Sequence, residues 1–130
     1  MKIDKIQITV RADIPADRIG DLIVGAIEGG SNYWAHFRFP GGWVKHHDNY
    51  YDIPMNGGAI VVMDIETNER LGELNEYTVR RGLQMMADGK DINGKKIPLR
   101  HFKNFAMEND DVETADVFMQ LAVMGEVVYG

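Results

Sequence analysis

The residues best suited to molecular recognition form one short segment, 28–34, with the sequence EGGSNYW. Two glycines let the backbone approach a ligand closely, and the rings of Tyr33 and Trp34 each combine a flat apolar face with one polar atom. The segment therefore predicts a recognition surface. A helix end followed by a core strand that begins with two aromatic residues would give the same pattern, so both interpretations stay open.

Arginine and further aromatic side chains could complete such a surface. A guanidinium group offers a rigid fork for phosphate, and an aromatic ring beside it stacks a nucleobase. A solvated helix face is the alternative for each arginine. We predict that a small nucleotide-like anion binds where two groups of residues converge, from one subunit or from two: Asn32, Tyr33 and Trp34 with Arg81, Arg100 and Phe102.

Catalytic chemistry has weaker support in the sequence. Glu28, Asp64 and Glu66 could act as acid and base only if their environments separate their pKa values. Strand ends that enter solvent explain the same carboxylates. The chain has no nucleophile elbow, phosphate-binding loop or dinucleotide fingerprint. We therefore predict a protein without catalytic residues or cofactor, that is, not an enzyme.

A metal site is not expected either. His46, His47 and Asp48 follow one another, but adjacent side chains of a strand point to opposite faces, and no metal-ligand spacing supports them. The chain contains no cysteine, which excludes disulfides, thiol nucleophiles and thiolate metal sites.

The composition is that of a globular protein. The 130 residues are 45% hydrophobic and 26% charged, and 20 acidic against 14 basic residues give a net charge of −6. This charge disfavours duplex nucleic acid as a partner. No stretch approaches the roughly 18 apolar residues of a membrane span, and the first five residues lack the apolar core of a signal peptide. We expect a soluble cytoplasmic protein without membrane association.

Periodicity predicts the elements that would position these groups. Residues 2–10 and 33–39 alternate as strands, and the apolar run 59–65 is typical of a buried central strand, which 71–74 would pair with. Helices are expected at 16–28, at 75–87, from 98 onward, and after the cap at 109–111. Residues 43–51 form an edge strand or a loop, and 127–129 could add a short strand.

This order of elements predicts one α+β domain over residues 1–130, with helices on one face of a small, mainly antiparallel sheet. The last helix carries Met119, Val123 and Met124 around it. Such a broad apolar surface indicates either a wide core-facing stripe or a subunit interface. We expect a homo-oligomer.

Three segments carry a resemblance: 28–34, the sequence ENDDVETAD at 108–116, and GEVVYG at 125–130. With them, nearly the whole chain resembles a family of small phage and prophage proteins. Its size and its aromatic and arginine content are also similar to the Thoeris anti-defence sponges, which sequester cyclic ADP-ribose-type signals and, in some members, cyclic oligonucleotides. This resemblance implies an oligomer in the host cytoplasm that holds its ligand near subunit contacts without turnover.

Two other classes of function remain open. A small nucleotide-processing enzyme would use Glu28, Asp64 or Glu66. A protein-binding inhibitor of a host factor would exploit the acidic surface, which can mimic nucleic acid.

Overall fold

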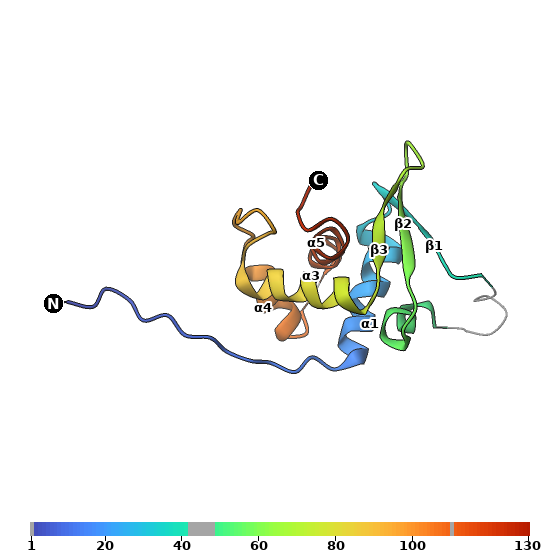
Figure 1. Ribbon diagram of the computed structural model, residues 1–130. Helices are drawn as coiled ribbons and strands as arrows, with labels where there is room; N and C mark the ends of the chain where they lie inside the picture. Colours follow the sequence, from blue (N-terminus) through green and yellow to red (C-terminus); the bar gives the residue numbers. More distant parts are fainter. Residues whose placement is uncertain (1, 42–48, 110) are drawn as a thin grey trace.

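The computed structural model describes residues 2–41, 49–109 and 111–130. They form an α+β fold in which helices cover one face of a three-stranded antiparallel sheet (Figure 1). The elements are α1 (Ala16–Gly25), the π-helical turn η1 (Ala26–Gly30), β1 (Ala35–Arg38), the 3-10 turns η2 (Tyr50–Asp52) and η3 (Pro54–Asn56), β2 (Ile60–Asp64), β3 (Arg70–Leu74), α3 (Glu76–Asp88), α4 (Arg100–Ala106) and α5 (Val112–Met124).

The sheet has the order β1-β2-β3, so β2 is its central strand. Ala35 lies opposite Asp64 in the first pair, and Ile60 lies opposite Leu74 in the second. The register shifts between Val62 and the next residue of β2, which produces a bulge before the turn to β3. The strands predicted at 33–39, 59–65 and 71–74 are confirmed.

Helix α5 is the centre of the core, because every residue from Thr114 to Val123 is buried. Neighbouring elements approach it closely through glycines. A Cβ added to Gly82 of α3 would lie 2.8 Å from the Ala122 Cβ, and one added to Gly72 of β3 would lie 2.9 Å from the Val123 carbonyl oxygen. The apolar surface of α5 is therefore its core-facing side, which confirms that interpretation of the helix, and the homo-oligomer stays a prediction.

Side chains and glycines fix both ends of the two long helices. At the start of α3, Asn75 and Thr78 exchange hydrogen bonds in a capping box, and the helix ends at Gly89 in the left-handed conformation. At the start of α5, the Asp111 carboxylate accepts the Thr114 N–H at 2.8 Å, and Gly125 ends the helix with φ of 79°. These signals explain why the predicted helix boundaries here are nearly correct.

The strand predicted at 2–10 is wrong. Residues 2–15 have neither helix nor strand, and the segment extends away from the body of the molecule (Figure 1). The alternating pattern records a side-chain preference, but a strand needs an edge to pair with, and no described strand of this chain pairs with the segment. Its apolar side chains are consequently exposed.

Three other predictions change. Residues 127–129 are not a strand, because the Gln120 side chain accepts the N–H groups of Val128 and Tyr129 in place of a neighbouring strand. The helix predicted at 16–28 is α1 and continues as η1 to Gly30. Of the polar-aromatic stretch 43–51, residues 43–48 lie outside the described residues, and 50–51 belong to a 3-10 turn.

Candidate functional site

The segment 28–34 is anchored to α5 through one carboxylate, that of Asp116. Asp116 Oδ1 accepts the Ser31 hydroxyl at 2.8 Å and the Trp34 indole N–H at 2.7 Å. Its Oδ2 accepts the Tyr33 hydroxyl at 2.6 Å. Ser31, Trp34 and Asp116 are all buried. Three donors from one turn of chain thus satisfy a carboxylate that burial would otherwise penalise.

The C-terminal segment joins the same network. The Gln120 side-chain N–H donates to Asp116 Oδ2 at 3.1 Å and to the Tyr129 carbonyl at 3.1 Å. The Tyr129 ring stacks on Trp34 with centroids 4.9 Å apart, and its hydroxyl donates to Asp64 at 3.0 Å. The polar groups of 28–34 therefore hold the loop, α5 and the C-terminal segment together.

The network also shifts the pKa values of Tyr33 and Asp64. Burial, together with the hydrogen bond to Asp116, raises the pKa of Tyr33 to about 12. Backbone N–H groups of Thr67 and Glu66, with the Tyr129 hydroxyl, lower the pKa of Asp64. The Asp64 carboxylate thus stays ionised while it caps the turn that follows β2.

The six residues predicted to bind a ligand come from three parts of the fold: the loop before β1, helix α3 and helix α4. Trp34 is in the core, whereas Asn32 and Tyr33 lie at the surface, Tyr33 with 53% of its area exposed. Among the described residues, no hydrogen bond, ion pair or ring contact joins this loop to Arg81, Arg100 or Phe102. The alternative of a core position is confirmed for Trp34.

The three remaining predicted residues have partners elsewhere. Arg100 pairs with Glu113 at 2.9 Å, on the surface where α4 meets α5. The Arg81 guanidinium donates to the Ala122 carbonyl at 2.6 Å, and Phe102 packs near Phe105.

The candidate acid–base and metal groups are also dispersed. Glu28 and Glu66 are exposed, and Asp64 serves the turn after β2. In residues 2–41, 49–109 and 111–130, no three His, Asp or Glu side chains form a group that could hold a metal ion. His46 and His47 lie outside the described residues.

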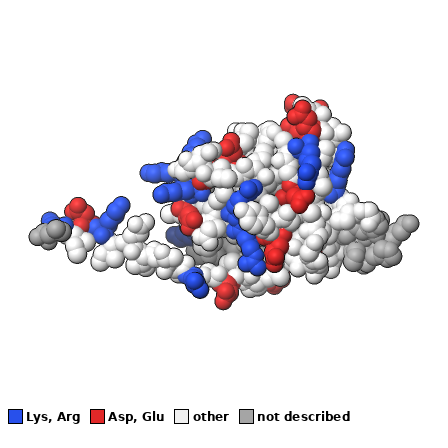
Figure 2. Space-filling model, in the orientation of Figure 1, with Lys and Arg blue, Asp and Glu red and all other residues white. Residues whose placement is uncertain are grey.

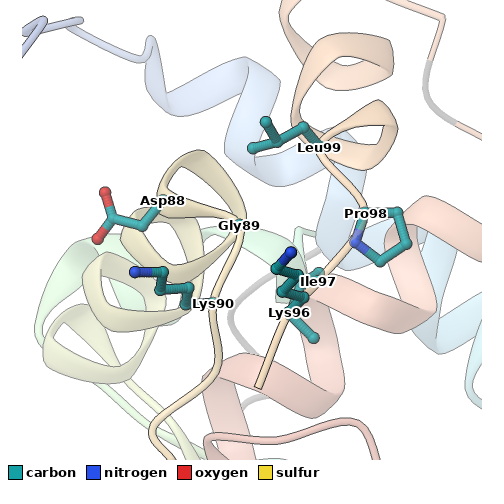
Figure 3. A pocket seen from close by; sticks show the side chains of 7 residues that line it. All are labelled: Asp88, Gly89, Lys90, Lys96, Ile97, Pro98 and Leu99. Carbon is teal, nitrogen blue, oxygen red and sulfur yellow. The ribbon is translucent and has the colours of Figure 1, made fainter. Parts of the chain in front are cut away.

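A surface pocket that the sequence did not predict lies where α3 ends. It has a volume of about 500 Å³, and seven residues line it: Asp88, Gly89, Lys90, Lys96, Ile97, Pro98 and Leu99. Figure 3 shows Asp88 and Lys90 on one side, Lys96 to Pro98 on the other, and Leu99 above. Apolar walls and two lysines make this a place where a flat apolar group and an anion could bind together.

Backbone contacts hold the two walls in place. Lys90 and Lys96 form an isolated antiparallel bridge, and the Ile97 N–H donates to the Gly89 carbonyl at 2.8 Å. Gly89 has φ of 68°, and a Cβ there would lie 2.8 Å from Leu99 Cδ2. Glycine takes this left-handed turn without strain, and a larger residue here would force the Leu99 side chain to move.

The loop between the two lysines is ordered by a buried carboxylate. Asp91 Oδ1 accepts the N–H groups of Asn93 and Lys95 at 2.8 and 2.9 Å, and Asp91 is buried. The Ile92 N–H donates to the Gly125 carbonyl at 2.9 Å, which attaches the loop to the end of α5. Basic side chains gather on the surface at this end of the molecule (Figure 2).

Comparisons with known proteins give no match: no family model, no curated protein and no solved structure matches this chain. Over the part of the chain that the structure describes, no helix is long and apolar enough to span a membrane.

Proposed function

We propose that the protein binds a small nucleotide-like anion in the pocket between Lys90 and Leu99 and holds it without turnover. The supporting observation is the pocket itself, whose lining combines the apolar residues Ile97, Pro98 and Leu99 with the two lysines Lys90 and Lys96. A base or ribose would contact the apolar walls, and the lysines would contact the phosphates. This position replaces the predicted one around Trp34, whose ring faces the core.

Binding fits this pocket better than catalysis does. Its lining contains no hydroxyl, thiol or imidazole group, and in this proposal its two lysines contact the phosphates and take no part in a reaction. Its one carboxylate, Asp88, accepts a hydrogen bond from Gln84 at 2.9 Å and stands without a second carboxylate in the lining. A nucleotide bound here would therefore leave unchanged.

The biological role that we propose is the one that the resemblance implies. The protein would act in the cytoplasm of an infected host cell, where it sequesters a cyclic ADP-ribose-type signal or a cyclic oligonucleotide. Because both lysines are exposed, solvent and salt screen each contact, and we expect micromolar affinity from one chain.

Calorimetry tests the proposal against a panel of cyclic ADP-ribose isomers and cyclic di- and trinucleotides. Lys90→Ala and Lys96→Ala should each weaken binding about fivefold to tenfold, because each removes one charge-assisted contact of partly screened strength. Lys95→Ala in the same loop is the matched control, because Lys95 does not line the pocket. It should change affinity by less than about twofold.

Two further measurements separate the alternatives. Arg100→Ala should leave affinity unchanged, whereas a loss of about tenfold or more would return the site to the predicted surface around Arg100. Ligand released by heat should have its original mass in chromatography, while converted ligand would indicate an enzyme. Absence of heat with every ligand would contradict the sponge proposal.

The inhibitor of a host factor is the second candidate. The observation that favours it is the exposed apolar side chains of residues 2–11, on a chain of net charge −6. A host-lysate pull-down would support this candidate if it recovered one stoichiometric protein, and if deletion of residues 2–11 abolished that recovery.

A further inference from the structure

The N-terminal segment, residues 2–11, exposes a row of apolar side chains. Ile3, Ile6, Ile8 and Val10 have between 74% and 81% of their area exposed. The segment has no secondary structure and extends from the start of α1 into solvent (Figure 1). A contiguous apolar surface of this kind on a folded chain marks a place where something binds.

The segment has the composition of a strand without a partner. Ile6, Ile8 and Val10 share one face of an extended chain, while Gln7 and Thr9 share the other. It contains neither glycine nor proline, and its β-branched residues favour extended pairing. Ten extended residues reach about 33 Å, longer than any strand of the sheet.

The sheet offers an edge for such a strand. In the described chain β1 and β3 each pair on one side only. The outer edge of β3 is partly closed, because the Thr78 hydroxyl donates to the Glu73 carbonyl at 3.0 Å. Just before β1, the Trp34 carbonyl faces β2 and accepts the Ile65 N–H. In an antiparallel strand the backbone groups of alternate residues point to opposite sides, so the N–H and carbonyl of Phe37 point away from β2.

Side chains at this edge also suit an added strand. Phe37 is half-buried and packs against the core, so its ring provides apolar surface beside the free edge. A strand added there could place Ile6 and Ile8 on the same face as Phe37.

We propose that residues 2–11 of one chain add as a β-strand to the free edge of β1 in a second copy, and that the exchange is reciprocal. Within the described residues, each copy has an unpaired segment at 2–11 and an unpaired edge of β1, so a two-fold arrangement satisfies both. Within one chain the segment points away from the side of the molecule where β1 lies (Figure 1). This pairing would also supply the predicted homo-oligomer by a route other than α5.

Sedimentation equilibrium is the first test. The full chain should have twice the monomer mass of 14.7 kDa at about 50 µM, and a chain lacking residues 2–11 should be monomeric. The shortened chain should keep the helical signal of its circular dichroism spectrum, since every described helix lies outside the segment. Ile8→Asp should raise the dimer dissociation constant at least about tenfold, whereas the control Gln7→Asp, on the opposite face, should raise it less than about threefold.

Engineered cysteines identify the partner, because the chain has none of its own. A chain with Thr9→Cys and a second chain with Arg38→Cys are mixed and oxidised. A disulfide between the two different chains supports the proposal, provided that a Thr9→Cys, Glu76→Cys mixture gives none. A full-length monomer at about 50 µM, or a dimer that persists without residues 2–11, overturns it. Slow hydrogen exchange of the amides at 6–10 in a monomer would also overturn the proposal, because it would place the segment on the sheet of its own chain.

Discussion

Substitution of Asp116 should destabilise the fold in graded steps. Its carboxylate is the shared acceptor for Ser31, Tyr33 and Trp34. Asparagine can keep its oxygen toward Ser31 and Trp34, and would then turn its amide toward the Tyr33 hydroxyl, which is half-exposed and can bond to water. Alanine would leave the buried Ser31 hydroxyl and Trp34 N–H without an acceptor.

The size of each step follows from these contacts. An unsatisfied buried donor costs roughly 1–3 kcal/mol, so Asp116→Ala should cost about 3–5 kcal/mol in the free energy of unfolding. Asp116→Asn loses charge assistance and the acceptor for both the half-exposed Tyr33 hydroxyl and the buried Gln120 amide, which keeps its bond to the Tyr129 carbonyl; the cost amounts to about 1–3 kcal/mol. Glu76→Gln is the control, because the exposed pair that Glu76 makes with Arg80 contributes at most about 0.5 kcal/mol.

Urea unfolding measures these values, with tryptophan fluorescence and far-ultraviolet circular dichroism as two probes. Coincident transitions would justify two-state free energies. The order of stability should be wild type and Glu76→Gln, then Asp116→Asn, then Asp116→Ala. If Asp116→Ala unfolded within about 1 kcal/mol of the control, the network would not be a main support of the fold. If alanine prevents folding altogether, the asparagine variant still gives the graded value.

Further predictions concern packing and pH. Gly82→Ala should cost at least about 2 kcal/mol in the urea assay because the new Cβ meets α5 backbone, while Gly41→Ala, with no atom within 4 Å, should be neutral. Tyr33 ionises near pH 10 when unfolded and near 12 when folded, so its contribution is complete below pH 10 and disappears as pH rises through 12. In Tyr33→Phe the urea midpoint should therefore fall less over that range. Burial, followed by the charge of Arg100, lowers the pKa of His101 below 6.5. Stability should consequently fall as pH drops below 6.5, and His101→Gln should reduce that fall in the same assay.

The sequence predicts best those elements whose boundaries are set locally. The capping box at Asn75 and the glycine after α5 are such signals, and the helices lie close to where they were expected. The strand at 2–10 was predicted from side-chain alternation alone, but pairing depends on an edge elsewhere in space. The pocket was missed because it depends on the conformation of Gly89 and on the packing of Leu99 against it, which no motif records.

The role of the segment 28–34 also depends on contacts between residues that are distant in the sequence. Its residue types suit either a ligand or a buried polar network, and the choice depends on whether a carboxylate meets them in the fold. Asp116 supplies that carboxylate, and it lies 85 residues after Ser31 and 82 residues after Trp34 in the sequence. The periodicity of a single sequence cannot reveal a pairing at this separation. The Trp34 N–H is therefore already used, and its ring is stacked on Tyr129.

The network around Asp116 limits what the resemblance implies about the ligand of this chain. The three segments on which it rests, 28–34, 108–116 and 125–130, contribute the network around Asp116 and Tyr129. Residues that hold a scaffold together constrain its fold, whereas ligand choice depends on the surfaces the scaffold presents. The pocket at 88–99 and the N-terminal segment 2–11 both lie outside those motifs. Two chains that share the motifs could therefore bind different ligands, and substitutions at Lys90, Lys96 and Ile8 test function more directly than any change in the motifs themselves.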